Sequence, residues 1–471
     1  MREKIRQEIY QKLEEMTVRN RAGISALSDR VSLAEYRDLA EDGIWTAALQ
    51  KALNEHEIVV IPPSGIPYLI DDTVTIPSDR RIEAEGAVIR LTPECKVLMF
   101  RNEHTVDGTH APADAAERDH NISICGGRFE ESCTGRAGYG RTGRYYPCPE
   151  GETKSERRAA GFFGVSTCML FNNMEGLTVT DVTFAHTAGF AVQTGDITDA
   201  WFENIAFDSC YADGLHMNGR SENIIARHIH GEVGDDLVAL NMYDWQNSSV
   251  NFGPTRTVLC EDLELSPSSG YKALRIQPGI YTYDDGSTVD CGLFNAIIKN
   301  VRGIETFKMY FQTPAYTVGT APERGAVGSA DNLFFEDITV DLTGPIDVFR
   351  EYKESDPVRG VFAAFELGSN IGYISFENID LTLHREKYPL SCLVSVGPKS
   401  IRVGDREIFD PYLSSRVEQI DFCNIKVNGT AVENPGGMDL VRTVAFEDVN
   451  GDGNSTGRGE IGRICWYDDK E

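Results

Sequence analysis

Three aspartates in two short segments have the residue types and the spacing for acid–base chemistry. Asp213 opens an Asp-Gly-Leu-His segment, and Asp235 and Asp236 open a second one, Asp-Asp-Leu-Val. Apolar residues alternate after the acids, which is the pattern of a strand with one buried face. Placing Leu215 over Leu237, a shift of 22 residues, brings the three carboxylates to one edge of two stacked strands. Like charges this close repel, so at least one pKa should rise.

Asp and Gly are also ordinary turn residues, so a single Asp-Gly pair would be interpreted as a turn. An Asp-Gly stacked on an Asp-Asp concentrates charge, and folds keep such clusters mainly where catalysis or a cation requires them. Asp213, Asp235 and Asp236 are therefore the candidate catalytic residues. The 11 cysteines are scattered without a Cys-x-x-Cys pair, which favours buried reduced thiols. We expect neither a metal nor a cofactor.

The elements that must position these acids repeat along the chain. From about residue 120, short alternating strands are each broken by one polar residue, and most of these breaks stand 23 to 46 residues apart: Asp181, Asn204, His228, Asp262, Asn300, Asp337, Asn378 and Asn424. A base period near 23 residues with loop insertions fits one coil of a right-handed parallel β-helix. Polar side chains at the same bend of each coil can bond to their neighbours above and below. We predict a structural ladder here and not further catalytic acids.

The predicted fold is all-β, a single-stranded right-handed parallel β-helix with an N-terminal helical cap. Residues 1–55 have helical spacing and are expected to form the cap, because an open coil end exposes unpaired backbone and core. Residues 56–471 are expected to form the solenoid, with loop insertions at about 133–160 and 242–254. The segment 461–467 is a candidate for closing the other end.

The amino-acid composition excludes several classes of binding partner. A net charge of −28 argues against nucleic acid or an anionic membrane, and mildly against a long polyanion. No apolar run is long enough to span a membrane, and the first residues lack the apolar core of a secretory signal. We therefore expect a cytoplasmic protein. Solenoid sides can associate, so a homo-oligomer such as a trimer is compatible with the sequence.

Three loops carry further candidates. The locally basic loop 133–160 could contact an anionic group or pair with the acidic body. Tyr243 and Trp245 follow the Asp-Asp strand, where an aromatic ring could stack on a sugar or cover the coil edge. Residues 448–460 resemble a calcium loop, but the final acid stands one place late, so a surface turn is the simpler interpretation.

A polar outward face follows from the same alternation. Placing Leu274 over Leu237 buries Leu274 and Ile276 in one column. The side chains that then point outward beside the acids line a cleft along the solenoid: His216, Arg275, Gln277, Lys308 and Tyr310. These residues, with Tyr243 and Trp245, are the candidate substrate-binding residues.

The motifs Asp213-Gly-Leu, Gly234-Asp-Asp and Leu274-Arg-Ile, in that order, resemble glycoside hydrolase family 28 and family-28-related bacterial proteins. That family includes polygalacturonases and rhamnogalacturonases on a right-handed parallel β-helix. The resemblance covers about residues 40–430 as architecture, and 212–277 as motifs. It implies an inverting hydrolase acting on an oligosaccharide.

The resemblance also implies a role for each residue. Asp236 would be the general acid, Asp213 and Asp235 would hold the attacking water as general base, and Arg275 would contact the substrate beside the cleaved bond. Inversion places acid and base about 6.5–9.5 Å apart, which leaves room for that water. Crowded carboxylates would keep the acid protonated near neutral pH.

Two departures from the family concern the substrate. The family's Gly-His-Gly strand is absent, and His216 is the nearest substitute that stacking suggests. The family's lysine after the arginine is Gln277, and a neutral amide suits a neutral sugar better than a uronate. Lys308 or the arginines of 133–160 could restore a cation, so pectin-type uronic and neutral sugars both stay open.

Other functions on the same solenoid stay open too. If the three aspartates bind calcium, Arg275 or His216 could abstract a proton next to a uronate carboxylate, as in a lyase or epimerase. A fructan-type glycosyl transferase is a further alternative. A non-catalytic carbohydrate-binding solenoid is the last one, and it leaves the stacked acids unexplained.

Overall fold

The computed structural model describes residues 2–93, 95, 98–110, 117–131, 167–244, 249–269, 272–302, 309–311, 327–342, 361–397, 401–403, 406–408, 414–432, 438–446 and 457–467. Its contacts divide the chain into two compact units. The N-terminal unit comprises Tyr10–Val238 and Asn247–Phe252, and the C-terminal unit comprises Met1–Ile9, Ala239–Gln246 and Gly253–Glu471.

The N-terminal unit contains the 3-10 helix η1 (Leu33–Leu39), helix α2 (Thr46–Glu55) and the strands β1 (Arg30–Ser32), β2 (Ile58–Val60), β3 (Tyr68–Ile70), β4 (Val74–Ile76), β5 (Arg80–Glu83), β6 (Val88–Leu91), β7 (Phe100–Asn102), β8 (Asp119–Cys125), β9 (Arg128–Glu130), β10 (Thr167–Ala185), β11 (Phe190–Cys210), β12 (Leu215–Asn218) and β13 (Ser221–Val233). Helix α1 (Arg2–Ala26) and strand β14 (Asp236–Asn241) have residues in both units.

The C-terminal unit contains the strands β15 (Thr255–Leu265), β16 (Lys272–Ile276), β17 (Gly279–Thr282), β18 (Thr288–Cys291), β19 (Leu293–Arg302), β20 (Met309–Phe311), β21 (Ser329–Leu342), β22 (Phe362–Leu367), β23 (Asn370–Leu383), β24 (Ser391–Val396), β25 (Ile401–Val403), β26 (Arg406–Ile408), β27 (Ser415–Val427), β28 (Thr430–Ala431), β29 (Val441–Thr443), β30 (Ala445–Phe446) and β31 (Gly457–Tyr467). None of the helices that the structure describes is long and apolar enough to cross a membrane.

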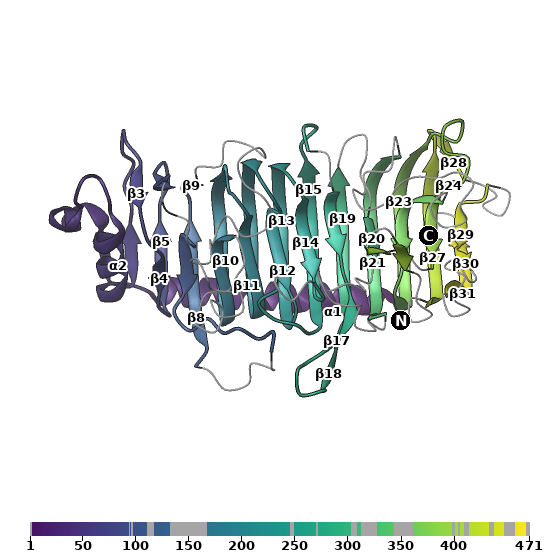
Figure 1. Ribbon diagram of the computed structural model, residues 1–471, viewed down its shortest axis with the longest axis horizontal. Helices are drawn as coiled ribbons and strands as arrows, with labels where there is room; N and C mark the ends of the chain where they lie inside the picture. The colour runs from purple at the N-terminus through teal and green to yellow at the C-terminus, as the bar shows by residue number, and fades with distance from the viewer. Residues whose placement is uncertain are drawn as a thin grey trace. The chain divides into compact units, whose positions relative to one another are not determined.

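Successive coils pair in parallel within each unit. In the N-terminal unit β8, β10, β11 and β13 lie side by side (Figure 1), with Leu177 opposite Ile122 and Ala200, and Ala200 opposite Ile224. In the C-terminal unit β15, β19, β21, β23 and β27 pair the same way. Parallel pairing of consecutive coils stacks like residues on like residues, so each buried column is continuous.

The predicted polar ladder is confirmed in both units. In the N-terminal unit Asp181 and Asn204 have φ of 60° and 55°, and the Asn204 amide donates to Asp181 at 2.6 Å. In the C-terminal unit Asn378 donates to Asp337 at 2.8 Å and accepts from Asn424 at 2.7 Å. A left-handed backbone at each bend explains the residue types, because Asn and Asp tolerate positive φ better than other non-glycine residues.

A second ladder, which the repeat pattern did not predict, turns the other corner of the coils. Asn121 donates to Asp79 at 3.0 Å, and Asn223 donates to Asp199 at 2.8 Å. All four residues have φ between 54° and 62°. The register places Gly176, with φ of 76°, between Asn121 and Asp199 in this row. The row therefore lacks one side chain.

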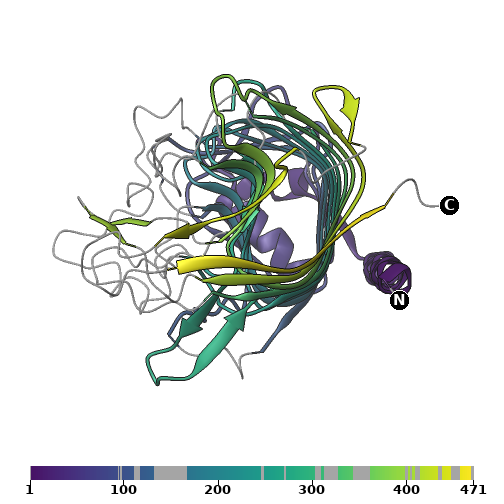
Figure 2. The same cartoon turned by 90° about the vertical axis from the view of Figure 1, so that its right-hand side faces the viewer.

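Helix α1 fills that gap in the N-terminal unit. Asn20 donates to the carbonyls of Leu177 and Asp199 at 3.3 and 3.0 Å, and Arg19 binds the Asp199 carboxylate through two bonds of 2.8 and 3.0 Å. Gly23 approaches so closely that a Cβ would lie 2.6 Å from Asn121 Oδ1. Residues 10–26 of α1 thus lie along the outside of the strands of this unit, and Figure 2 shows the purple helix α1 outside the coils.

Residues 1–55, predicted to form a helical cap, also contain a strand. Strand β1 interrupts the helical stretch and pairs in parallel with β2, so these residues extend the sheet. Helix α2 packs on β2 and β4 and buries Ala48, Leu49, Ala52 and Leu53, as a cap would. The helical spacing at the start of the chain reflects α1, whose polar residues bind the outer face of the strands.

The ladder gives a stability prediction. Asn378→Ala should lower the free energy of unfolding by about 2–4 kcal/mol, because alanine in a left-handed bend costs about 1–2 kcal/mol and each lost hydrogen bond about 1 kcal/mol. Asn378→Gly, which keeps the backbone freedom, should lose only about 1–2 kcal/mol. Urea unfolding followed by circular dichroism measures both variants, and equal losses would contradict the role of backbone strain.

Candidate active site

Asp213, Asp235 and Asp236 come together in the N-terminal unit. Asp213 lies just before β12, Asp235 just before β14, and Asp236 is the first residue of β14. One carboxylate oxygen of each lies within 4.8 Å of the other two. Their exposed fractions are 2%, 6% and 0%, so the cluster is almost removed from bulk water.

Backbone contacts explain why the three acids converge. The Gly214 N–H donates to the Asp236 carbonyl at 3.0 Å, and the Asp236 N–H donates to Asp213 Oδ1 at 3.1 Å. A Cβ on Gly214 would lie 2.5 Å from the Leu237 carbonyl oxygen and 2.5 Å from the Phe207 ring. Only glycine therefore allows the two segments to approach this closely.

His216 belongs to the same cluster, and its predicted contact with a substrate stays a prediction. The ring is 1% exposed, and its Nδ1 lies 2.5 Å from Asp213 Oδ2. The Phe190 ring stacks on the His216 ring, with ring centroids 3.8 Å apart and planes 12° apart. His216 is thus held between the β11 strand and Asp213, where it can orient that carboxylate.

Two buried amides that sequence reasoning missed lie beside His216. Gln193 stands opposite His216 in the parallel register and donates to Asn218 Oδ1 at 2.8 Å. The Asn218 amide nitrogen lies 3.3 Å from His216 Nε2, and Asn218 Oδ1 also accepts from the Val250 N–H at 3.1 Å. The register opposite His216 was the signal that could have identified Gln193.

In the C-terminal unit Gln277 and Tyr243 are buried and bonded to each other, and their predicted contacts with a substrate stay predictions. Gln277 is fully buried, and its amide donates to the Tyr243 carbonyl at 2.9 Å. Tyr243 is 6% exposed and packs over Gly279, where a Cβ would lie 2.6 Å from the ring. Arg275 is half-buried in β16. The Gln277 amide therefore fixes the strand edge after β14.

The remaining predicted residues have no described side chain. Lys308, Trp245 and the basic loop 133–160 lie outside the described residues. Tyr310 lies in β20, opposite Glu366 of β22. Of the calcium-like loop, 448–456 lie outside the described residues, and Glu460 belongs to β31, where it pairs with Arg416 at 3.1 Å.

Carboxylate oxygens are the ligands that hard cations prefer, so the Asp213, Asp235 and Asp236 cluster has the chemistry to hold calcium or magnesium. A second group, Glu103, His104 and Asp119, also lies within 4.8 Å. There burial raises the pKa of Asp119, but bonds from the His104 ring and backbone outweigh it and lower that pKa. Asp119 in turn raises the pKa of His104, so this second group is satisfied internally.

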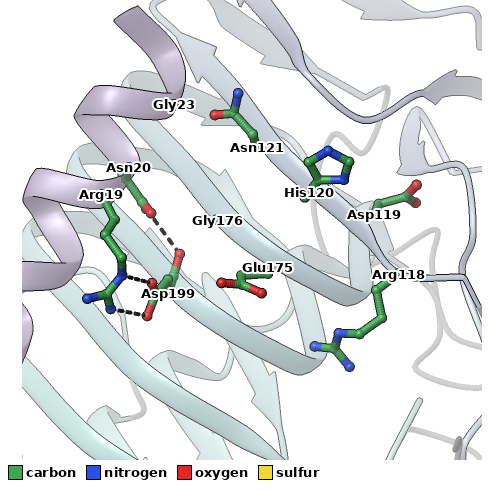
Figure 3. A pocket seen from close by; sticks show the side chains of 10 residues that line it. All are labelled: Arg19, Asn20, Gly23, Arg118, Asp119, His120, Asn121, Glu175, Gly176 and Asp199. Carbon is green, nitrogen blue, oxygen red and sulfur yellow. Dashed lines mark hydrogen bonds and ion pairs between the residues drawn. The ribbon is translucent and has the colours of Figure 1, made fainter. Parts of the chain in front are cut away.

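A pocket of about 490 Å³ lies apart from the acid cluster, between α1 and the strands β8, β10 and β11 (Figure 3). It is lined by Arg19, Asn20, Gly23, Arg118, Asp119, His120, Asn121, Glu175, Gly176 and Asp199. Arg19 is paired with Asp199, and Arg118 with Asp196 at 2.9 Å. Arg19 docks the helix through Asp199, whereas Arg118 pairs with Asp196 of β11, so both arginines are paired and we assign no chemistry to this pocket.

The contact at Gly214 gives a prediction that is independent of any activity. Gly214→Ala should lower the free energy of unfolding by about 1–3 kcal/mol, because the new methyl group overlaps the Leu237 carbonyl and the Phe207 ring. The matched control is Gly65→Ala, since a Cβ there meets nothing within 4 Å. Urea unfolding compares the two, and an unchanged midpoint for Gly214→Ala would contradict the close approach.

No protein-family model matches the chain, and no curated protein matches it in sequence. Solved structures do. A hyperthermoactive exopolygalacturonase from Thermotoga maritima matches with a TM-score of 0.53 at 10% identity, over 98% of this chain and 96% of that one. A polygalacturonase from Erwinia carotovora matches with 0.45 at 12% identity, over 88% and 95% of the chains.

A tailspike protein of the E. coli bacteriophage HK620, in complex with a pentasaccharide, also matches, with a TM-score of 0.49 at 11% identity over 84% of this chain and 63% of that one. At 10% identity the match to the exopolygalacturonase shows the fold alone. The chain is mostly β and shares the right-handed parallel β-helix of that protein, as the sequence predicted.

Proposed function

We propose that this protein is a glycoside hydrolase that cleaves an oligosaccharide by acid–base catalysis. Asp236 is the general acid, and Asp213 and Asp235 hold the attacking water. The convergence of three carboxylates within 4.8 Å, on a polygalacturonase-like fold, is the observation that carries the proposal. A fold that crowds three acids in a buried site bears a large electrostatic penalty, which catalysis explains best.

The spacing of the oxygens suits a bound water. Two acceptors that each lie about 2.8 Å from one tetrahedral water are about 4.6 Å apart. The three oxygens lie no more than 4.8 Å apart, an upper bound that is compatible with a water shared by Asp213 and Asp235. It is shorter than the about 6.5–9.5 Å between acid and base in most inverting enzymes, and nearer the about 5–5.5 Å of retaining ones. We keep inversion because two carboxylates, and not one, face the acid.

The burial of the acids sets a requirement on catalysis. With exposed fractions of 6% or less, the three carboxylates touch an oligosaccharide only if the chain around them opens in the complex. Enclosure has a benefit as well, since the same charges act more strongly on the reacting atoms when water is excluded. His216, paired with Asp213, keeps that carboxylate oriented during this change.

The substrate class is an oligosaccharide, with neutral and uronic sugars both retained. Gln277 favours a neutral sugar, and its amide, which donates to the Tyr243 carbonyl, reaches a sugar only if the chain opens there as it must around the acids. Arg275 is the described cation of the predicted cleft and is half-buried in β16. We propose that it contacts the sugar beside the cleaved bond.

Asp236→Asn should reduce the rate of cleavage by about 10²–10⁴-fold, because an amide cannot donate the acid proton to the leaving oxygen. The matched control is Asp181→Asn, the same change at a ladder position whose neighbour is already an asparagine. A panel of neutral and uronic oligosaccharides, read by mass spectrometry, measures both. Equal loss in the two variants would assign the effect to folding and not to chemistry.

The stereochemistry has its own test. Proton NMR of the first product formed should show the anomer opposite to that of the cleaved bond, as inversion requires. Retention of configuration would make Asp213 or Asp235 a nucleophile and not a base.

A second function is favoured by the same cluster. Three carboxylates within 4.8 Å are a ligand set for calcium, whose bonds to oxygen are about 2.3–2.6 Å long. A calcium-dependent lyase would then release an unsaturated product that absorbs ultraviolet light and would stop in chelator. The hydrolase proposal predicts full activity in chelator and no ultraviolet absorbance in the product.

A further inference from the structure

A buried carboxyl outside the acid cluster holds the turn that leads into it. Glu131 directly follows β9 in the N-terminal unit and is 4% exposed. Its own N–H donates to the Ala185 carbonyl at 3.1 Å, and its Oε2 accepts from the Ala188 N–H at 2.6 Å. Ala188 lies in the turn 186–189, which joins β10 to β11.

This turn contacts two residues of the candidate active site. The residue that follows the turn, Phe190 of β11, stacks on His216 with ring centroids 3.8 Å apart. The next residue, Ala191, donates its N–H to the Asp213 carbonyl at 2.9 Å, and the Tyr211 N–H donates to the Thr187 carbonyl at 2.9 Å. The position of the turn therefore determines the position of the segment 211–216 that carries Asp213.

The surroundings of Glu131 favour an uncharged carboxyl. Its described neighbours are the thiols of Cys168 and Cys210, both buried, and no lysine or arginine side chain of the described residues contacts it. Burial raises the pKa of Glu131 to about 8, against the weaker opposing effects of the Ala188 N–H and Cys168. Burial and Glu131 also raise the pKa of Cys168, and burial raises that of Cys210 to about 12, so both thiols stay protonated.

The other charged groups near the turn face a different side. His186, the first residue of the turn, interacts with Asp208, which is itself bound by Arg128. Glu130, the neighbour of Glu131 in the chain, points to Arg90 and Arg128. Both pairs lie outside the buried pocket of Glu131, so they do not neutralise a charge on it.

We propose that Glu131 is a positioning residue for the candidate active site: its buried carboxyl anchors the turn 186–189 and, through Phe190 and Ala191, the segment with Asp213 and His216, and loss of its proton releases the turn. A carboxylate in this pocket needs water. The turn is the irregular part of its surroundings, whereas Cys168 lies within a strand and Cys210 ends one. Ionisation of Glu131 therefore opens the turn first.

Hydrogen exchange read by mass spectrometry tests the inference on the intact protein without substrate. After correction for the intrinsic effect of pH, protection of peptides covering 186–192 should fall about tenfold from pH 7 to pH 9, since one pH unit above the midpoint leaves about one carboxyl in ten protonated. In Glu131→Gln, which stays neutral and still accepts from Ala188, the fall should be less than twofold.

The controls separate this effect from general loosening. Glu130→Gln removes the same charge one residue away and should keep the wild-type fall in protection. Glu131→Ala should leave the turn unprotected at both pH values; if that variant does not fold, the glutamine variant still decides. A turn whose protection does not depend on pH in the wild type, or depends on it equally in Glu131→Gln, would overturn the proposal.

Thermal unfolding provides a second readout with a fixed sign. The folded-state pKa of Glu131 lies above that of the unfolded chain, so its stabilising effect is complete below about pH 4.5 and is lost as the pH rises towards 8. The Tm of Glu131→Gln should therefore rise relative to the Tm of the wild type as the pH is raised from 4.5 to 8. A constant difference would contradict a buried, proton-dependent anchor.

A third test measures catalytic activity as a function of pH, and it rests on the proposed function. The wild-type kcat should fall above pH 8 and the Glu131→Gln profile should extend further into the alkaline range, with Glu130→Gln following the wild type. If none of these proteins cleaves any oligosaccharide, the proposed function fails, and the exchange and thermal measurements still decide the role of Glu131.

Discussion

Hydrogen bonds between Asn and Asp side chains at successive bends are the interaction on which the rest of both units depends. Each bend needs a left-handed backbone, and these side chains both tolerate that conformation and bond to the next coil. Asn204 on Asp181 in the N-terminal unit and Asn378 on Asp337 in the C-terminal unit repeat one geometry. Because every coil turns at the same place, strands from distant parts of the sequence stay in register.

The register explains how acids far apart in the sequence can meet. Asp213 and Asp236 lie at the starts of strands in consecutive coils, and the Asp236 N–H bonds directly to Asp213. Gly214 permits this approach, and His216 and Phe190 pack against it. The packing and hydrogen bonds of the coils thus hold the three like charges close together, and neither acidic segment could keep them there by itself.

Much of this could be predicted from the sequence because the fold is periodic. The polar breaks near Asp181 and Asn204 and the apolar alternation after Asp213 are local patterns that report directly on strands and bends. The orientation of single side chains could not be predicted, since it depends on what the neighbouring coil offers. Gln277 was assigned to the cleft by alternation, yet its amide reaches the Tyr243 carbonyl and is buried.

Residues that belong to no repeating pattern could not be predicted from the sequence. Glu131 follows a short strand and belongs to no motif, and its burial arises from the thiols of Cys168 and Cys210, which lie 37 and 79 positions further along the chain. Helix α1 was recognised as a helix, but its docking depends on the missing side chain at Gly176. Both features follow from stacking that has no sequence period.

The proposed addition of water across a glycosidic bond by the three carboxylates can be tested by isotope labelling. Oligosaccharides are incubated with the protein in water enriched in oxygen-18, and the products are read at once by mass spectrometry. One heavy oxygen is expected at the new reducing end of each cleaved product. A cleaved product without the label would exclude hydrolysis and would identify elimination or internal transfer as the chemistry of this site.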